Sequence, residues 1–320
     1  MTDSCRIGVV LSSGGGRGIY AHTGFLLALE QLGVSICASA GCSAGAVVGG
    51  VAASGTRLDD WAHTISRVSQ RDFWTPDSLP RFLWQVVVRR GRGYTGLSSA
   101  CAAIAFCRRN LAVQTFEECR YPFYAVAMSL GRGRKVVFSA GELAPRMMAS
   151  AAMPVLYRPV EIDGDFYCDG ALVDLAPMDA ICCRHRLDAL IVHHVAQRYD
   201  QPGGIAKTLG RRWALAEISA RLLFHRRPWY LSDERLTLRS CPGGCGAPIV
   251  VLEPDLPELR WPLIDGGLVV QQAALEQTLA LLQSHAVALL TDPRSRLSAP
   301  ALDPAVSAVH RAPMCAPGLP

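Results

Sequence analysis

Residues 36–53 read ICASAGCSAGAVVGGVAA and place a serine between a short apolar strand and a helix of small residues. Their centre, residues 41–45 (GCSAG), has the form G-x-S-x-G, whose small flanking residues let a strand turn sharply into a helix. The helix N-terminus after such a serine favours negative charge. Matches this short also arise by chance, but the strand before it and the helix after it favour Ser43 as a nucleophile. Cys42 is out of register for that role, and we expect it to be a packed small residue.

The residues before this segment repeat the same order of elements. Residues 6–12 (RIGVVLS) are rich in strand formers, a glycine cluster follows at 14–16, and residues 19–32 have helical periodicity. Gly33 stands where a helix C-terminal cap is expected. Two successive strand–turn–helix units predict an α/β protein with a parallel sheet and crossover helices.

Three functions compete for the glycine cluster. The dinucleotide fingerprint G-x-G-x-x-G is excluded because Ile19 stands where its last glycine is required, and a P-loop is excluded because no Gly-Lys-Ser/Thr follows. Consecutive backbone N–H groups at a helix N-terminus could instead hold a developing negative oxygen, as an oxyanion hole does. A plain glycine-rich turn is the alternative for Gly14, Gly15 and Gly16.

A serine hydrolase also needs a base, and the candidates downstream are an aspartate and two histidines. Asp169 follows a predicted hairpin strand at 165–168, although the Asp-Gly dipeptide that it begins is more often a simple turn. His193 and His194 complete the order Ser…Asp…His of α/β-hydrolases. They lie in an apolar strand, 187–195, where structural histidines are usual, so a triad is the weaker alternative.

Further patterns outline the rest of the chain. We predict a core-facing helix through Trp61 and Ile65, and hairpins over 124–139 and 158–168. The organisation that we expect is one domain over 1–290, with the motifs at about 6–195 and a helical C-terminal part at about 200–290, and a disordered Pro/Ala-rich tail over 291–320.

Composition excludes several classes of protein. Of 320 residues, 50% are hydrophobic and 18% charged, so a large core forms and wholesale disorder is excluded. The net charge of +5 is too mild to indicate nucleic-acid binding. The first residues do not have the pattern of a signal peptide, and no apolar run is long enough for a membrane span. We therefore expect a cytoplasmic protein.

Two stretches combine arginines with aromatic residues, 82–92 and 211–230. Such stretches suit peripheral contact with an anionic membrane surface, although a solvated helix face is the commoner explanation. Our expectation places membrane contact at 211–230, with Arg226 and Arg227 as the residues to test.

The twelve cysteines are scattered from Cys5 to Cys315. A zinc site requires four ligands at recognised spacings, and the sequence clusters two at most. We expect small buried thiols in a reducing compartment and no metal.

Four motifs in order resemble the patatin-like phospholipase family of serine acyl hydrolases. They are LSSGGG with AHTGFL (11–26), AGCSAG (40–45), ASAAMP (149–154) and DGALV (169–173), and the resemblance covers about residues 6–195. One departure concerns the family's Gly-Gly-Gly-x-Arg-Gly segment, because gap-free matching puts Gly18 where the arginine belongs. Either Arg17 serves instead or that arginine's role is lost.

The resemblance implies a three-layer α/β/α fold and hydrolysis of carboxylic esters in phospholipids, lysophospholipids or simpler acyl esters, without a metal or organic cofactor. It implies that Ser43 is the nucleophile and Asp169 its base, in a dyad without histidine. It also implies that Gly14, Gly15 and Gly16 form the oxyanion hole. A catalytically silent lipid-binding or scaffold protein with the same fold is the alternative.

Overall fold

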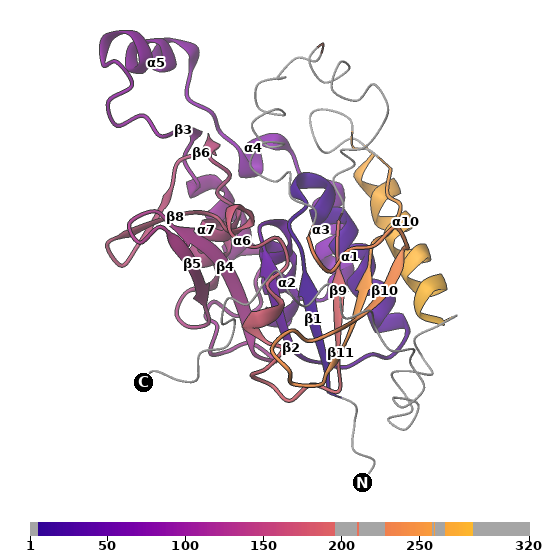
Figure 1. The fold of residues 1–320 in the computed structure, drawn as a ribbon. Coiled ribbons are helices and arrows are strands. Elements are labelled where there is room, and N and C mark those ends of the chain that lie inside the picture. The colour runs from indigo at the N-terminus through magenta and orange to yellow at the C-terminus, as the bar shows by residue number, and fades with distance from the viewer. Residues whose placement is uncertain (1–5, 196–209, 211–227, 258, 260–265, 284–320) are drawn as a thin grey trace.

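The computed structural model describes residues 6–195, 210, 228–257, 259 and 266–283. Within these residues one sheet of nine strands forms the centre of the molecule, in the order β10-β11-β9-β1-β2-β4-β8-β7, with β5 paired to β4 (Figure 1). Its parallel strands are β1 (Ile7–Leu11), β2 (Ile36–Cys42), β4 (Phe123–Ser129), β9 (Ala189–His193) and β11 (Pro248–Leu252). The antiparallel strands lie at the two sides: β5 (Arg134–Phe138), β7 (Val160–Ile162), β8 (Asp165–Asp169) and β10 (Leu236–Ser240).

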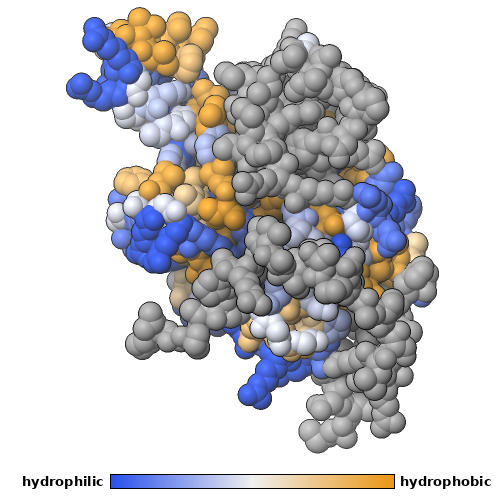
Figure 2. All heavy atoms as spheres, viewed as in Figure 1, coloured by the Kyte–Doolittle hydropathy of each residue, from blue (hydrophilic) through white to orange (hydrophobic). Residues whose placement is uncertain are grey.

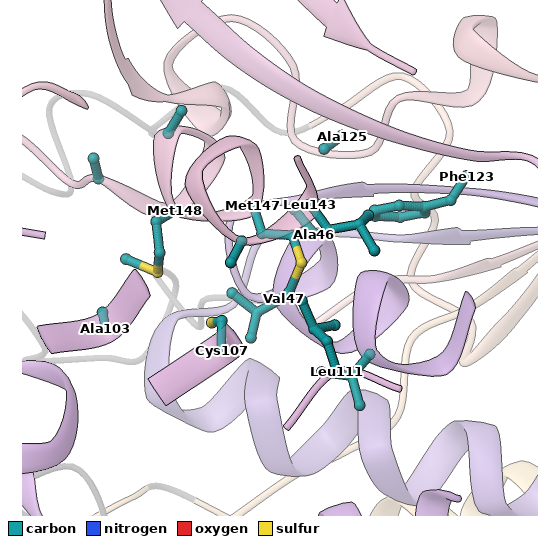
Figure 3. Close-up of a cluster of buried hydrophobic side chains, with 14 of the residues drawn as sticks. Ala46, Val47, Ala103, Cys107, Leu111, Phe123, Ala125, Leu143, Met147 and Met148 are labelled. Carbon is teal, nitrogen blue, oxygen red and sulfur yellow. The ribbon is translucent and has the colours of Figure 1, made fainter. Parts of the chain in front are cut away.

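Helices cover one face of this sheet. The helices packed on its strands are α1 (Gly15–Gln31), α2 (Ala44–Ser54) and α7 (Leu143–Ala151), and α3 (Leu58–Ser66), α6 (Cys101–Arg109) and α10 (Gly267–Leu281) pack against these helices. Figure 1 shows α1 and α10 alongside each other, and a side chain at Gly24 of α1 would meet the carbonyl oxygen of Gln271 at 2.1 Å. Figure 3 shows Leu143 and Met147 of α7 beside Ala46 of α2, within the largest buried cluster.

The opposite face of the sheet is buried by a shorter layer. Alternate side chains of the strands, such as Val10 and Val192, pack there against residues 176–187, which include η3 (Met178–Ala180), and against Tyr230. The central parallel strands are therefore buried on both faces, as strands between two covering layers are. The expected three-layer α/β/α fold is confirmed.

A smaller assembly extends from the body. It consists of α4 (Gln70–Phe73), α5 (Leu79–Leu83), η1 (Trp84–Val88) and the two-stranded sheet of β3 (Gly96–Ser98) and β6 (Val155–Tyr157). Figure 1 shows α5 projecting away from the central sheet. The part of the chain that the structure describes contains no helix with the length and apolar character to cross a bilayer.

The structure differs from the sequence-based expectation in the C-terminal part. A pair of strands, β10 and β11, occupies 236–252, where we expected helix. The run PIVVL of β11 is apolar throughout because β11 pairs in parallel with β9 and is buried on both faces. α10 (Gly267–Leu281) agrees with the helix expected in this part of the chain. Of the arginine- and aromatic-rich stretch at 211–230 the structure describes only 228–230, and the expected tail at 291–320 lies outside the described residues.

Candidate active site

Ser43 occupies a strained turn between β2 and α2. Its φ of 54° and ψ of −119° are rare for a residue with a side chain. A side chain at Gly41 would lie 2.3 Å from the carbonyl oxygen of Gly45, and one at Gly45 would lie 2.1 Å from that of Leu11. Both glycines of the G-x-S-x-G segment are therefore required for the chain to turn here.

The fold brings Asp169 directly to this serine. Asp169 is the last residue of β8, which pairs with β4 beside β2, so the carboxylate lies next to the end of β2. Ser43 Oγ donates a hydrogen bond of 2.7 Å to Asp169 Oδ2. A side chain at Gly170 would lie 2.1 Å from the carbonyl oxygen of Val126, so the Asp-Gly pair allows the close approach of β8 to β4.

The environment of Asp169 makes it a stronger base than an ordinary aspartate. The residue is only 1% exposed, and burial raises the pKa of its carboxyl group to about 6. Hydrogen bonds from Ala171 N–H to Oδ1, at 2.9 Å, and from Ser43 oppose that increase. A carboxylate with a pKa close to neutral is well suited to accept a proton at physiological pH.

The glycine cluster lies at the start of α1, beside the serine. Gly15 and Gly16 line the same pocket as Ser43 and Asp169, while Gly14 precedes the helix and is not among the pocket residues. The first N–H groups of a helix have no acceptor within the helix itself. Gly15 has a φ of 56°, in the left-handed region that favours glycine. The start of α1 can therefore present N–H donors to an oxygen bound next to Ser43.

The departure from the family's glycine segment has a steric reason. A side chain at Gly18 would begin 2.8 Å from the Cβ of Ala44, the residue after the serine. Gly18 thus lets α1 approach α2, and an arginine side chain at this position has no room. Arg17 lies near His194, whose pKa is lowered to about 3 mainly by burial and further by the charges of His22 and Arg17.

Ser150 is a site residue to which the sequence analysis gave no role. It lies in α7 and is fully buried; its Oγ accepts a 3.0 Å hydrogen bond from the N–H of Ser43 and donates one to the carbonyl oxygen of Val126. It therefore ties the serine turn to β4. A polar residue within the small-residue motif at 149–154 was the available signal.

The histidines lie behind the glycine cluster. His22 Nε2 lies 2.7 Å from the carbonyl oxygen of Ser12 and His22 Nδ1 lies 2.8 Å from His193 Nδ1, whereas His194 Nδ1 lies 3.1 Å from Tyr230 Oη. Burial lowers the pKa of His22 to about 4 and that of His193 well below its usual value, so both are neutral. A triad places an imidazole between serine and carboxylate. The direct contact of Ser43 with Asp169 leaves no room for one, so this geometry contradicts the triad.

An apolar pocket of about 290 Å³ opens beside the serine and the aspartate. Aromatic and aliphatic side chains form most of its wall, among them Tyr20, Trp61, Ile65, Phe73, Trp74, Phe106 and Met148. Trp61 and Ile65 belong to the helix that was expected to face the core; they are buried as expected and also line this pocket.

Fold and site together define a class of protein: α/β proteins with a serine in a strained strand-to-helix turn and an aspartate in direct contact with it. The chain belongs to the patatin-like phospholipase family, whose model matches residues 9–181, more than half of its length.

Relatives agree with this assignment. An uncharacterised NTE family protein of Mycobacterium bovis is 36% identical over 180 residues, which are 56% of this chain and 46% of that protein. Lysophospholipase NTE1 of Cryptococcus neoformans is 31% identical over 176 residues, 55% of this chain and 10% of that one. The chain thus spans about half the length of the mycobacterial relative and a small part of the fungal one.

Among solved structures, human GIVD cytosolic phospholipase A2 has a similar fold. Its TM-score is 0.51 at 11% identity, with 91% of this chain and 62% of that chain covered. This likeness supports the three-layer fold.

Proposed function

We propose that this protein is a serine acyl hydrolase that cleaves carboxylic esters of phospholipids, lysophospholipids or simpler lipids. The observation that carries the proposal is the 2.7 Å hydrogen bond from Ser43 to the buried Asp169 in the wall of an apolar pocket. Membership of the patatin-like phospholipase family and similarity to a lysophospholipase support lipid esters as the substrate class.

In the proposed reaction Asp169 accepts the proton of Ser43 as Oγ attacks the ester carbonyl carbon. The N–H groups of Gly15 and Gly16, which begin α1 and line the pocket, stabilise the negative oxygen of the tetrahedral intermediate. Collapse of this intermediate releases the alcohol or lysolipid, which takes the proton from Asp169 and leaves an acyl-serine. Asp169 then accepts a proton from a water molecule as the water oxygen attacks the acyl carbon. Collapse of this second tetrahedral intermediate returns the proton to Ser43 Oγ and releases the fatty acid.

The pocket supplies the preference for a fatty acyl chain. Burying one methylene contributes about 0.8 kcal/mol, which corresponds to about fourfold in kcat/KM. A series of p-nitrophenyl esters of increasing chain length should therefore gain about fourfold per methylene until the pocket is filled. A flat or falling series would contradict the assignment of the pocket to the acyl chain.

Variants of the two residues test the proposal. Ser43→Ala and Asp169→Asn should each lose nearly all hydrolysis of both short-chain esters and phospholipids, and the double variant should lose little more, because the residues act as one unit. Ser54→Ala, a buried serine at the other end of α2, and Asp59→Asn, an exposed aspartate of α3, are matched controls that should retain activity. Full turnover by Asp169→Asn would refute the dyad. A folded wild type without hydrolysis on either substrate class would favour the silent lipid-binding alternative.

We further propose that the projecting segment 77–95 contacts the lipid surface from which substrate is taken. Its apolar side chains are unusually exposed, with Leu79 and Val87 each 68% and Trp84 58% exposed, and three exposed arginines follow within 89–92. Figure 2 shows orange, hydrophobic surface beside blue, hydrophilic surface on the part of the molecule that carries α5. Apolar side chains beside arginines complement the core and the anionic headgroups of a bilayer.

The base of this segment lies at the pocket. The chain leaves the pocket wall at Trp74, and a hydrogen bond from Asp77 N–H to the carbonyl oxygen of Leu97, at 2.8 Å, fixes its base beside β3. A bilayer in contact with segment 77–95 would therefore lie on the same side of the molecule as the part of the pocket wall that Trp74 forms. We expected residues 211–230 to make this contact. Of that stretch the structure describes only 228–230.

Vesicle co-sedimentation tests this contact. Arg89→Glu with Arg90→Glu should weaken binding to anionic vesicles by at least about 30-fold, since each lost cation contributes about 1 kcal/mol. Trp84→Ser with Val87→Ser should weaken it as well, whereas Leu268→Ser with Val269→Ser, which are 54% and 63% exposed on α10, should not. Hydrolysis of a soluble short-chain ester should stay unchanged in all three. Wild-type binding by both segment variants would refute the assignment.

A further inference from the structure

Four cysteines that are distant in the sequence meet at one place in the fold. Cys182 and Cys183 follow η3, and Cys241 and Cys245 lie in the connection between β10 and β11. Their four Sγ atoms all lie within 4.8 Å of one another, with 3.5 Å from Cys182 to Cys245 and 3.6 Å from Cys183 to Cys241. This arrangement contradicts our expectation that at most two cysteines cluster.

The spacing of the four sulfurs fits a tetrahedral metal site. Zinc binds thiolate sulfur at about 2.3 Å, so the edges of a ZnS₄ tetrahedron measure about 3.8 Å. The distances between the Sγ atoms of this cluster run from 3.5 Å to at most 4.8 Å, a range that includes this edge length. A disulfide requires about 2.05 Å between its sulfurs, and both close pairs are far longer.

The local backbone explains how two of the ligands are presented together. Residues 241–245 (CPGGC) form a tight turn in which the N–H of Gly244 donates a 3.0 Å hydrogen bond to the carbonyl oxygen of Cys241. Gly244 has a φ of 75°, in the region that glycine adopts readily. The turn brings both ends of the five-residue segment toward the adjacent pair at 182–183.

We propose that these four cysteines form a structural zinc site that joins the β10–β11 connection to the segment before β9. Four protein ligands fill the coordination sphere of zinc and leave no position for water or substrate, which is the pattern of structural sites. The cluster precedes β9 and β11 and so lies at the amino ends of the parallel strands, whereas Ser43 follows the carboxyl end of β2. The site therefore stabilises the β10 side of the sheet and takes no part in ester hydrolysis.

Metal analysis of the full-length protein tests the proposal. Protein purified under reducing conditions without chelators should contain about one zinc per chain. Replacement of zinc by Co²⁺ should give the absorption bands of tetrahedral cobalt with thiolate ligands. Cys241→Ser with Cys245→Ser should abolish both signals. Cys37→Ser with Cys101→Ser, a partly buried and an exposed cysteine outside the cluster, is the matched control and should keep both.

Measurements on the wild type keep the test independent of how well the variants fold. Chelation should lower its Tm, and mass spectrometry after alkylation without reductant should find all twelve cysteines as thiols. Wild-type protein that stays metal-free after incubation with zinc would overturn the proposal. So would disulfides joining Cys182 to Cys245 and Cys183 to Cys241, or zinc retention by the double variant equal to that of the control.

Discussion

Replacing Asp169 by asparagine should make the protein more stable at neutral pH while it abolishes hydrolysis. Burial raises the pKa of this carboxyl group from 3.8 to about 6, so the folded state disfavours the ionised form. At about 1.4 kcal/mol per pH unit, this difference corresponds to about 3 kcal/mol of unfolding free energy that the wild type lacks at about pH 8. An asparagine can keep the local geometry, because its oxygen can accept from Ala171 N–H and its amide can donate to Ser43 Oγ.

The sign of the pH dependence follows from the raised pKa. The stabilisation that the protonated carboxyl group gives to the wild type is complete below about pH 4 and is lost as pH rises through about 6. The difference in unfolding free energy between variant and wild type should therefore grow by about 2–3 kcal/mol from about pH 4 to about pH 8. Any difference in unfolding free energy between Asp169→Asn and the wild type that is already present at about pH 4 does not affect this change with pH.

Urea unfolding curves of wild type and Asp169→Asn across this pH range provide the measurement. Asp59→Asn, whose side chain is 73% exposed, is the control and should follow the wild type at every pH. A variant-to-wild-type difference that stays constant with pH would refute the reasoning. A wild type that gains stability over the variant as pH rises would refute it more strongly, because the carboxylate would then be stabilised by the fold.

The base, the serine turn and the ion pairs of Lys135 give three further predictions. The kcat/KM for a soluble ester should fall tenfold per pH unit below about pH 6, because the base must be ionised; a profile flat to about pH 4 would exclude Asp169 as that base. Gly45→Ala should abolish activity and lower Tm, because the new side chain would meet a backbone oxygen of β1 at 2.1 Å; full activity would contradict the strained turn. Lys135→Met should destabilise the fold by about 2 kcal/mol, measured by urea unfolding, because it leaves the partly buried Asp174 and Asp179 unpaired; an unchanged midpoint would show that the pair contributes little.

The parts of the fold that the sequence predicted are those decided by neighbouring residues. The turn at Ser43 requires glycine on both sides for steric reasons, so its pattern is visible in five letters. The hairpin at Asp163 and Gly164 is also determined by its own residues. Both adopt positive φ, 52° and 77°, and the Asp-Gly dipeptide favours that conformation. Such local requirements constrain the sequence directly.

The parts that were missed depend on contacts between distant segments. The short run of β11 is apolar throughout, so its hydrophobic pattern does not distinguish a buried strand from a buried helix. Its pairing with β9 makes it a strand. Ser150 has its role through contacts with Ser43, 107 residues away. The two cysteine pairs are likewise about 60 residues apart, and neither pair has a recognised metal spacing.

Labelling with a fluorophosphonate tests the central claim, that Asp169 activates Ser43, most directly. Intact-mass analysis should show one label per wild-type chain, peptide mapping should locate it on Ser43, and Ser43→Ala should stay unlabelled. The labelling rate should fall below about pH 6 and should drop by at least about 100-fold in Asp169→Asn, since loss of general-base assistance has this magnitude. Labelling of folded Asp169→Asn at the wild-type rate, or no labelling of the folded wild type, would contradict the account.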